Sequence, residues 1–498
     1  MITNRTRLAV EIAALGGAAG LAGDALLRVM PWGLNVFVCV TALVAAAALL
    51  VRRYRVTPGP DAPWLAITAV LLGAAFLRRD AKVLATFDAV ALLVTLSLGA
   101  ASLQGERIAG WRALDYLRAG VTAAAGSIAG GIVLVTHDVR WSELPHEGRL
   151  RHVRAAALGV LLAAPLLAVF AGLFASADQV FGNVLANVLR FDAGAVVSHT
   201  FFICAWAALA AGYLRWSFLN RPLALPATAT NAALGIIPVG TALGLLNVLF
   251  LLFVVVQLRY FFGGSGLVEE TTGLTYAEYT RRGFFELVTA SGLVLPLLLG
   301  ADHLVRREAP AHIAVFRRLA GLLLVLLAVI MTSALQRMRL YVDAFGMSEI
   351  RLYATAFMIY LLGVFAWFGW TVLRSRRQQF AFGALMHGFA VLTGLHVLNP
   401  DAFIVRTNLN RPAAERPFDT KYALTLGADA VPLLLQALPR FPVADRCAVA
   451  AGLLRRWNPS ERADWRTWNW SRSRTRRLVH DSAPALRALP CKASLEKE

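Results

Sequence analysis

The sequence predicts an all-α fold, a polytopic helical membrane bundle of roughly 11–12 transmembrane helices followed by a small helical C-terminal domain. Of the 498 residues, 58% are hydrophobic and only 16% are charged, whereas soluble globular proteins are nearer half apolar and a quarter charged. The apolar residues gather in runs of about 20, the length that a helix needs to cross a bilayer. This composition excludes a soluble, disordered or disulfide-built protein.

Twelve apolar runs are candidate spans, and all of them precede residue 399. Nine are long and poor in charge: Leu34–Val51, Leu84–Leu103, Val153–Ala175, Val197–Leu214, Ala233–Leu258, Phe284–Gly300, Leu319–Leu335, Tyr353–Leu373 and Ala381–Leu398. Three are weaker: Leu8–Leu27, Trp64–Leu77 and Ala119–Val135. The first of these carries two acidic residues, the second is short, and the third is rich in glycine and alanine. We therefore place a membrane domain at residues 1–398 and a C-terminal domain at 399–498.

The formal net charge of +19 is distributed over both parts of the chain. Residues 399–498 hold 17 Lys and Arg against 10 Asp and Glu, a net charge of +7, which leaves +12 for the first 398. Such a basic chain could bind nucleic acid. Here most basic residues lie in short loops between apolar runs, where they orient the spans and meet anionic lipid head groups. We expect the lipid bilayer and its anionic head groups as partners, and no nucleic acid.

Loop arginines also predict the orientation of the bundle. If one weak span among the first five does not cross the membrane, four arginine-rich loops share one side. These loops hold Arg52/Arg53/Arg55, Arg215/Arg221, Arg306/Arg307/Arg317/Arg318 and Arg374/Arg376/Arg377. Short loops rich in Lys and Arg stay in the cytoplasm, so the segment after Leu398 is expected in the periplasm.

Three glycine pairs have the i, i+4 spacing that lets membrane helices approach closely. They are Gly16/Gly20, Gly126/Gly130 and Gly240/Gly244. Such pairs also arise by chance in a chain rich in glycine and alanine. They predict a packed bundle and nothing more specific.

The C-terminal domain is expected to consist of short helices separated by prolines. Trp457, Trp465, Trp468 and Trp470 cluster there with Arg466, Arg472, Arg474, Arg476 and Arg477. Tryptophan with arginine suits a membrane interface, but the tryptophans could equally pack a small core with the arginines outside, the interpretation that we favour. A disulfide between Cys447 and Cys491 is possible only if this domain lies outside the cytoplasm.

Two polar sets are candidates for an anion or polar binding site, because arginine grips phosphate and carboxylate groups with two hydrogen bonds. The first comprises Arg337, Arg339, Tyr341 and Asp343, with Arg351. The second comprises Asn399, Asp401, Arg406, Asn408, Asn410 and Asp429, and could lie against loops that carry Arg281/Arg282 and Arg337/Arg339. Each set also has a purely structural interpretation. The first could be an interfacial anchor with an Arg339–Asp343 pair, and the second could dock the C-terminal domain. We favour these two structural interpretations over a binding site.

Other signals of chemistry are weak or absent. The loop with His137, Asp138, Glu143, His146, Glu147 and His152 invites a metal hypothesis, but its spacings match no standard site and a solvated loop is the better interpretation. Histidines near span ends are more typical of structural roles than of proton relays. The chain contains no Walker, dinucleotide-binding or GxSxG motif. We expect no metal and no cofactor, and an enzyme is less expected than a non-enzyme.

Several stretches of the second half resemble an uncharacterised bacterial multi-pass membrane-protein family, catalogued only as a domain of unknown function. They are QLRYFFGGSG, GLTYAEYTRRGFFEL, SALQRMRLYVDAFGMSEIRLY, LNPDAFIVRTNLNR, DTKYALTLGADAVPLLL and DWRTWNWSRSRTRR, in this order over residues 257–477. The combination is specific, although each piece alone would be weak. The resemblance implies an integral membrane protein with a polar C-terminal segment, and it implies no activity.

Three functional hypotheses remain. The first is a non-enzymatic bacterial inner-membrane protein for sensing, scaffolding or envelope assembly, with an unidentified membrane or envelope protein as a possible partner. The second is a transporter or lipid flippase, suggested by the number of spans and by a glycine-broken helix near Gly263. The third is an envelope enzyme that acts on a lipid-linked anionic substrate, with Asp401 or Asp429 as the base.

Overall fold

The computed structural model confirms the predicted all-α class. It describes residues 3–143, 193–220, 235–262, 284–305, 310–411, 417–457 and 464–491, with isolated positions between 163 and 178. These residues form helices joined by turns and contain no β-strand. Ten of the described helices are long and apolar enough to cross a membrane, so the chain is a multi-pass membrane protein. The expected span Val153–Ala175 is described only at isolated positions.

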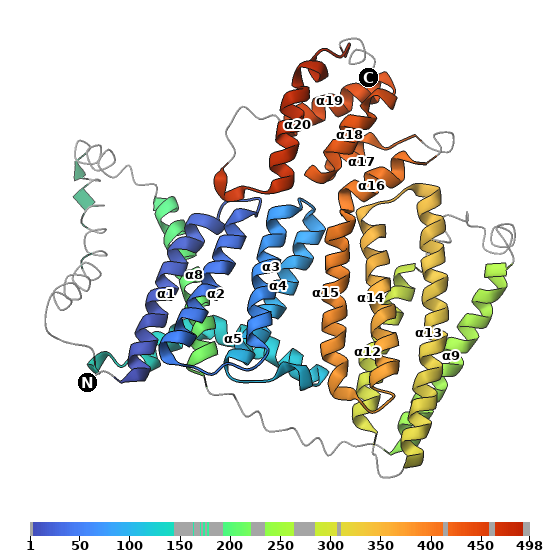
Figure 1. The fold of residues 1–498 in the computed structure, drawn as a ribbon, viewed down its shortest axis with the longest axis horizontal. Coiled ribbons are helices and arrows are strands. Elements are labelled where there is room, and N and C mark those ends of the chain that lie inside the picture. Colours follow the sequence, from blue (N-terminus) through green and yellow to red (C-terminus); the bar gives the residue numbers. More distant parts are fainter. Residues whose placement is uncertain are drawn as a thin grey trace.

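The membrane helices form two groups that meet at α15 (Figure 1). The first group contains α1 (Asn4–Leu27), α2 (Leu34–Tyr54), α3 (Ala62–Arg78), α4 (Lys82–Leu103) and α8 (Ala193–Phe218). The second contains α9 (Ile236–Phe262), α12 (Phe284–Leu304), α13 (Pro310–Phe345) and α14 (Glu349–Thr371). The helix α15 (Phe380–Leu398) packs against α4 on one side and α14 on the other.

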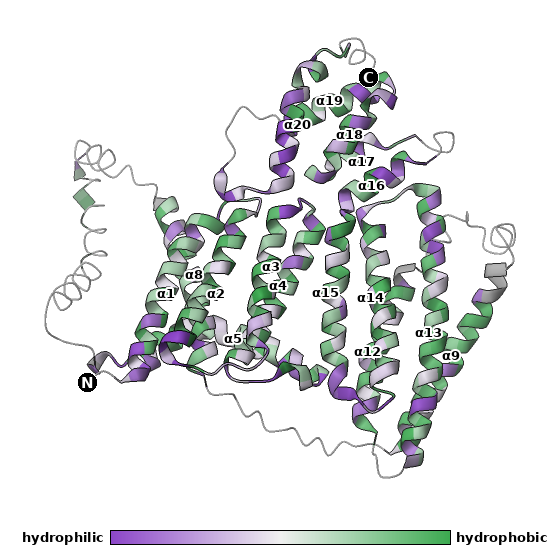
Figure 2. Cartoon of the chain, viewed as in Figure 1, coloured by the Kyte–Doolittle hydropathy of each residue, from purple (hydrophilic) through white to green (hydrophobic). Residues whose placement is uncertain are grey.

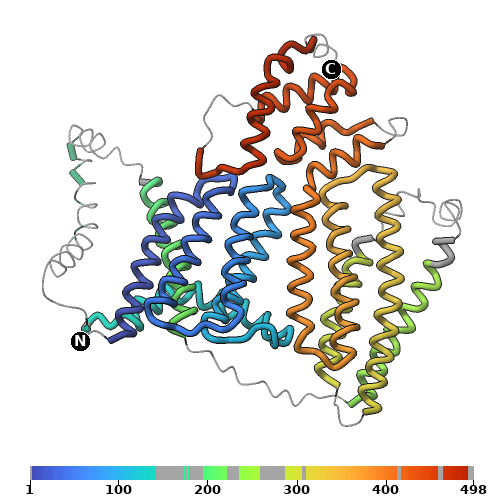
Figure 3. The backbone as a smooth tube through the Cα atoms, in the orientation of Figure 1, coloured from blue at the N-terminus to red at the C-terminus, as the bar shows by residue number. Residues whose placement is uncertain are grey.

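The helix α5 (Ala113–Val133) lies across one end of the bundle, although it has the length and hydropathy of a span (Figures 1 and 3). Before it, the backbone N–H of Ile108 donates to Asp61 at the start of α3, over 2.7 Å. After it, the carboxylate of Asp138 accepts from Arg215 near the end of α8, over 2.5 Å. Both ends of α5 therefore lie where α3 begins and α8 ends.

The two ends of the bundle differ in charge. We call the end where α5 lies the arginine end, because the described basic residues Arg52, Arg53, Arg215, Arg317, Arg374 and Arg376 gather there. Contacts join its loops: Arg53 pairs with Glu11 of α1 at 3.0 Å, and Arg317 donates to the hydroxyl of Ser375 at 2.5 Å. The opposite end carries the C-terminal domain and is called the domain end. Figure 2 shows hydrophilic residues concentrated at both ends and in that domain, with apolar helices between them.

Two of the three predicted glycine pairs mediate close packing against α8. A Cβ atom at Gly16 would lie 2.6 Å from the Cβ of Ala211, and one at Gly130 would lie 2.9 Å from the Cα of Gly212. The partner glycines Gly20 and Gly126 face α8 in the same way. The third pair is different, because a Cβ at Gly244 would meet nothing within 4 Å. Glycine spacing alone did not distinguish these cases.

The C-terminal domain stands on the domain end of the bundle (Figure 3). It contains α16 (Pro400–Leu409), α17 (Thr420–Thr425), α18 (Val431–Ala437), α19 (Val443–Trp457) and α20 (Trp470–Arg487). Its apolar core includes Ile404, Leu434, Val449 and Val479, together with Leu352 from the first turn of α14. The core of the domain is thus continuous with a membrane helix.

The tryptophans of this domain divide between its core and its surface. Trp457 is buried in the core, whereas Trp465, Trp468 and Trp470 are 64%, 43% and 49% exposed. The expectation that this cluster packs a small core is therefore wrong for three of the four residues. Short helices with many arginines leave no apolar face large enough to cover them, as the strongly polar α20 shows.

Candidate functional site

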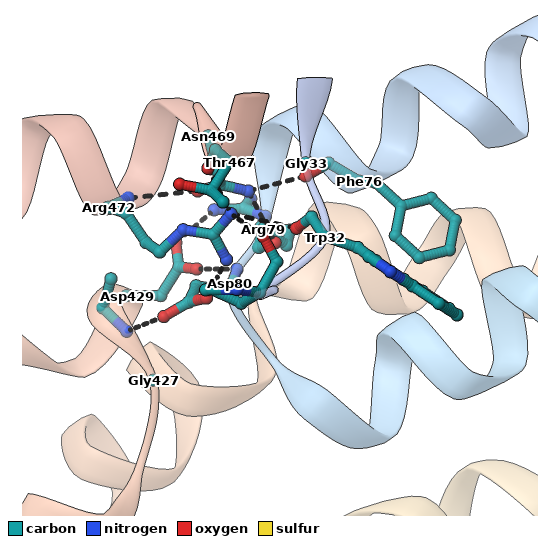
Figure 4. A network of polar contacts seen from close by, with 12 residues as sticks. Trp32, Gly33, Phe76, Arg79, Asp80, Gly427, Asp429, Thr467, Asn469 and Arg472 are labelled. Atoms are coloured by element: carbon teal, nitrogen blue, oxygen red, sulfur yellow. Dashed lines mark hydrogen bonds and ion pairs between the residues drawn. The ribbon is translucent and has the colours of Figure 1, made fainter. Parts of the chain in front are cut away.

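A turn between α3 and α4 is the centre of a polar layer between the membrane bundle and the C-terminal domain (Figure 4). At this turn, Arg79 donates from Nη1 to Oδ1 of Asp429 over 3.0 Å. Its Nε and Nη2 atoms donate to the carbonyl oxygen of His396, near the end of α15, over 3.1 and 2.8 Å. The backbone N–H of Asp80 donates to the second oxygen of Asp429 over 3.0 Å. Both oxygens of the Asp429 carboxylate thus have a donor.

Both carboxylate oxygens of Asp80 also accept hydrogen bonds, in this case from residues of the C-terminal domain. Its Oδ1 accepts from Nη1 of Arg472 over 2.8 Å, and its Oδ2 accepts from the backbone N–H of Ala428 over 3.0 Å. The guanidinium of Arg472 also donates to the carbonyl oxygens of Trp32 and Thr467, over 2.9 and 2.7 Å. Only 7% of the Arg472 side chain is exposed. Because both oxygens of Asp80 and both oxygens of Asp429 have a donor, the charges of these two buried carboxylates are compensated.

Contacts made by the Asn469 side chain and by the backbones of Gly33 and Gly427 surround this network. Asn469, the N-cap residue of α20, donates from Nδ2 to the carbonyl oxygens of Phe76 and Arg79, over 2.7 and 2.9 Å. One side chain therefore caps the start of α20 and the end of α3 together. At Gly33 a Cβ atom would lie 2.9 Å from Nη2 of Arg472, and at Gly427 it would lie 2.6 Å from a carboxylate oxygen of Asp401. Glycine is required at both positions for the backbones to approach.

Asp401, on the first turn of α16, is the most buried carboxylate of the layer, with 1% of the residue exposed. Its Oδ2 accepts from the backbone N–H of Gly427 over 2.8 Å, whereas its Oδ1 has no hydrogen-bond partner among the described residues. Burial, followed by the neighbouring carboxylates Glu349, Asp429 and Asp80, raises the pKa of Asp401 to about 7. A substantial fraction of this carboxyl is therefore protonated at neutral pH.

A second seam joins the C-terminal domain to α13 and α14. The side chain of Asn408 accepts from the backbone N–H of Met347 over 2.6 Å and donates to its carbonyl oxygen over 2.9 Å. Arg411 donates to the carbonyl oxygen of Asp343 over 2.8 Å, and the hydroxyl of Tyr422 accepts from the N–H of Glu349 over 2.8 Å. The domain therefore bonds to both groups of membrane helices.

The structure brings together only part of the predicted site. Asp401 and Asp429 lie in the polar layer, and Asn399 forms the left-handed turn between α15 and α16, with a φ of 59°. Arg339 and Asp343 are exposed on α13 and do not form the expected ion pair with each other. Arg337 is half-buried on the same helix, and Arg281 and Arg282 lie outside the described residues.

Two other members of the predicted set, Tyr341 and Arg351, contact each other. The guanidinium of Arg351 lies 4.1 Å from the ring centroid of Tyr341. Arg351 also donates to the carbonyl oxygens of Phe345 and Gly346 at the end of α13. Arg351 of the predicted cluster therefore caps the end of a helix, whereas Arg339 and Asp343 are exposed.

Sequence reasoning missed the basic partners of the two carboxylates. Arg79 and Asp80 were visible only as the polar end of a short apolar run, and Arg472 only as one of many arginines. The partners lie 350 and 392 residues apart in the chain, so no local pattern could have paired them. The carboxylates were expected to face Arg281/Arg282 and Arg337/Arg339, but the hydrogen-bond partners of Asp401 and Asp429 include neither Arg337 nor Arg339 of the described arginines.

Two Asp–His pairs lie near the domain end and were also missed. Nδ1 of His199 lies 2.6 Å from Oδ2 of Asp24, joining α8 to α1. Nε2 of His396 lies 2.9 Å from Oδ1 of Asp88, joining α15 to α4. The Asp88–His396 pair is the more buried of the two, with 3% and 12% of the side chains exposed. It sits beside the Arg79 contact to the backbone of His396.

The histidine-rich loop at the arginine end is not simply solvated. Asp138 is buried and pairs with Arg5 at 2.8 Å and with Arg215 at 2.5 Å. Glu143 accepts from the hydroxyls of Thr3 and Thr6, both over 2.7 Å. These carboxylates fasten α5 to α1 and α8. No group of three His, Cys, Asp or Glu side chains within the described ranges could hold a metal ion, and His146, Glu147 and His152 lie outside them.

The ion pair between Asp80 and Arg472 should be required for a stable C-terminal domain. We expect Arg472→Ala to destabilise the protein by about 3–5 kcal/mol, because it leaves a buried carboxylate without its charged partner. Thermal unfolding of the purified full chain in detergent measures the effect. Arg474→Ala is the matched control, since Arg474 is exposed on the same helix. Equal effects of the two substitutions would show that the ion pair does not hold the domain.

The raised pKa of Asp401 predicts a pH dependence of stability. The ordinary pKa is 3.8 and the folded value is about 7, so the folded state binds this proton more tightly than the unfolded state does. The resulting stabilisation is complete below about pH 4 and is lost as the pH rises to about 7. Asp401→Asn keeps an acceptor for Gly427 and removes the titration.

At pH 8 we therefore expect Asp401→Asn to be more stable than the wild type by on the order of 4 kcal/mol, with the difference shrinking towards zero near pH 4. Unfolding midpoints measured across this pH range test the expectation. The exposed Asp481→Asn serves as a control. A difference that does not change with pH would contradict the assignment.

The family model described as "Domain of unknown function (DUF4153)" matches residues 66–437, from the second turn of α3 to the end of α18. Comparison with curated proteins and with solved structures found no match. The match covers most of the chain and includes Arg79, Asp80, Asp401 and Asp429, and it confirms the resemblance seen in the sequence. The chain belongs to this family of unknown function, the DUF4153 family.

Proposed function

We propose that this protein is a non-catalytic component of the bacterial inner membrane, which holds a rigid helical domain on the periplasmic surface for sensing, scaffolding or envelope assembly. The polar layer is the observation that carries the proposal. All four oxygens of Asp80 and Asp429 accept hydrogen bonds from the protein itself. Groups so fully occupied fix a position, and they are not free to bind or activate a substrate.

The distribution of arginine supports this orientation. Arg52, Arg53, Arg215, Arg317, Arg374 and Arg376 lie in the described loops at the arginine end. At the domain end, Arg79 and Arg472 are buried in ion pairs, and the same α3–α4 turn exposes Arg78 and Lys82. By the positive-inside rule, the arginine end faces the cytoplasm and the domain end faces the periplasm.

The cysteines of the C-terminal domain support the same orientation. Cys447, on α19, and Cys491, after α20, form a disulfide with their Cα atoms 5.5 Å apart. Disulfides persist in the periplasm and are rare in the cytoplasm. The bond ties the end of the chain to α19 and helps to keep the domain rigid.

A surface on the C-terminal domain fits the membrane that it would rest on. The backbone carbonyl oxygen of Trp468 accepts from the backbone N–H of Leu34 at the start of α2, over 2.9 Å, so this exposed residue lies at the level of the helix ends. The guanidinium of Arg474 lies 5.5 Å from the ring centroid of Trp470, and Arg477 is exposed one turn further along α20. Tryptophan and arginine at this depth contact anionic lipid head groups.

A transporter or flippase is the second candidate, favoured by one observation. Asp88 and His396 pair at the interface between α4 and α15, within the membrane-spanning part of the chain. Ionisable residues inside the membrane commonly line substrate or ion pathways. The glycine turn near Gly263, which suggested transport in the sequence, lies outside the described residues. The enzyme hypothesis is weaker, because Asp429 is bonded to Arg79 and Asp401 is sealed beneath Gly427.

Cysteine labelling tests the orientation. We expect Lys421→Cys, on the C-terminal domain, to react with a membrane-impermeant maleimide in intact spheroplasts, because the positive-inside rule puts that surface outside. Gln378→Cys, exposed at the arginine end, should react only after lysis. Both variants carry Ala at Cys39 and Cys204, the free cysteines among the described residues. Labelling of Gln378→Cys in intact spheroplasts would overturn the proposed topology.

Complementation in the source bacterium tests the non-catalytic role. A deletion strain is scored for sensitivity to detergent and osmotic shock, and each variant is produced at matched membrane levels. We expect Asp401→Asn to restore the wild-type phenotype, because it preserves docking, and Arg472→Ala to fail, because it releases the domain. Failure of Asp401→Asn with normal folding would favour the enzyme hypothesis instead.

A further inference from the structure

A pocket of about 280 Å³ lies beside the first turns of α20, where the C-terminal domain meets the membrane helices. We call it the Trp–Arg pocket, because two tryptophans and two arginines supply most of its wall. The lining side chains are Trp468, Trp470, Ser473, Arg474, Arg477 and Leu478. Its volume is just below the range of pockets that hold drug-sized ligands. A small polar group is therefore the kind of ligand that it can take.

The two arginines of the pocket carry charges that the protein itself does not neutralise. Both are exposed, and within the described ranges neither forms an ion pair with a carboxylate. The guanidinium of Arg474 lies 5.5 Å from the ring centroid of Trp470, and Arg477 donates to the hydroxyl of Ser473 over 3.4 Å. Arg472, two residues before Arg474, is by contrast buried in an ion pair. The pocket is therefore electropositive and complements an anion.

Both guanidinium groups point along α20 towards the membrane helices. Side chains of a helix lean towards its N-terminus, and the contacts of these arginines run to Trp470 and Ser473, each four residues earlier. The N-terminus of α20 is the end that lies on the bundle, because the side chain of Asn469 bonds to the end of α3. An anion held by the two arginines therefore lies on the side of the pocket that faces the membrane.

Backbone contacts place the pocket at the ends of the membrane helices. The carbonyl oxygen of Trp468 accepts from the N–H of Leu34, the first residue of the span α2, over 2.9 Å. From there α20 rises away from the bundle (Figure 1). A rise of about 1.5 Å per residue puts Arg474 roughly 6 Å further along this helix than Trp470. The head-group layer on each side of the hydrocarbon core is roughly 5–8 Å thick, so the pocket is level with the lipid phosphates.

Tryptophans from two distant segments of the chain meet at this level. Trp32, in the loop between α1 and α2, is exposed, and its carbonyl oxygen accepts from Arg472 of α20 over 2.9 Å. The next residue contacts the pocket directly, because a Cβ atom at Gly33 would lie 2.4 Å from the carbonyl oxygen of Trp468. Tryptophan is enriched where a protein meets lipid head groups. A soluble anion needs no such rings, so they favour a lipid as the source of the anion.

We propose that the Trp–Arg pocket binds the phosphodiester group of one anionic phospholipid, with Arg474 and Arg477 donating to the phosphate oxygens and the tryptophan rings beside the head group. Guanidinium groups bind phosphate with paired, charge-assisted hydrogen bonds. The bound lipid ties the first turns of α20 to the leaflet, as Asn469 ties them to α3. The inference rests on the part of the proposed function that sets the domain on the membrane surface. It depends neither on a scaffolding role nor on which leaflet the domain faces.

Native mass spectrometry of the full chain in detergent micelles tests the proposal, with short-chain phosphatidylglycerol as the probe. Arg474→Gln combined with Arg477→Gln should weaken its binding roughly tenfold or more, since each basic residue contributes about fivefold at an anionic surface. The matched control is Arg455→Gln with Arg487→Gln, which removes the same charge from exposed positions of the same domain outside the pocket. It should change the affinity less than twofold. Equal losses in the two double variants would show unspecific attraction only.

Competition identifies the source of the phosphate. Inorganic phosphate and glycerol phosphate carry the same anionic group without acyl chains. In a tenfold molar excess over the probe, both should leave phosphatidylglycerol bound to the wild type. Displacement of the lipid by either anion would assign the pocket to a soluble phosphate and overturn the proposal.

Photo-crosslinking locates the lipid without changing the protein. Phosphatidylglycerol with a diazirine in its head group is crosslinked to the wild type in proteoliposomes, and the crosslinked peptides are mapped. We expect crosslinks to concentrate on residues 468–478 and on the loop that carries Trp32. An even spread over the ends of all membrane helices would overturn the pocket. Binding in micelles has no sidedness, so the pocket can fail while the cysteine labelling confirms the topology, and the reverse.

Discussion

The turn at Arg79 and Asp80 is the constraint on which the position of the C-terminal domain depends. Two guanidinium groups and two carboxylates meet there from segments of the chain that lie far apart. Removing such ions from water is costly, and the cost is offset only when each charge has a partner and each remaining lone pair has a donor. The backbone N–H groups of Asp80 and Ala428 supply those donors. The network therefore tolerates one placement of the domain, and Gly33 and Gly427 are the points at which the backbones must come close enough to form it.

The same domain also fastens the two groups of membrane helices to one another. It contacts the first group through Arg79, Asp80 and the turn before α2, and the second through Met347 and Glu349. Between these attachments, α15 carries the backbone carbonyl of His396 that Arg79 binds and the side chain that pairs with Asp88. A change in how the helix groups meet would therefore alter the contacts that hold the domain. An apolar groove between α4, α14 and α15 lies at this junction of the helix groups. This arrangement gives a physical basis for a sensing or scaffolding role in which the domain and the membrane helices act as one body.

Much of the architecture could be predicted because it depends on local composition. A run of about 20 apolar residues has few alternatives to a membrane helix, and the arginines between such runs indicated which loops share a side. The break at Asn399–Pro400 marked where the membrane helices end. Details that depend on neighbours were not predictable. The run Ala119–Val135 has the hydropathy of a span, but α5 lies across the arginine end because Asp61 and Asp138 hold both of its ends there. The tryptophans of the C-terminal domain were expected inside, and the small core had room only for Trp457.

The sequence by itself determined the helical class, the membrane location, the end of a membrane helix at Leu398 and the presence of Asp401 and Asp429 in a polar set. It could do so because helix formation and membrane partitioning are sums over neighbouring residues. The tertiary structure decided which arginines face those carboxylates, which glycines pack against α8, and which aspartates pair with histidines. These contacts join residues hundreds of positions apart, and their stability comes from desolvation and hydrogen-bond geometry that exist only after the helices have packed. A single sequence holds the members of the Arg79–Asp429 and Asp80–Arg472 pairs, and only the folded chain brings them within 3.0 Å of one another.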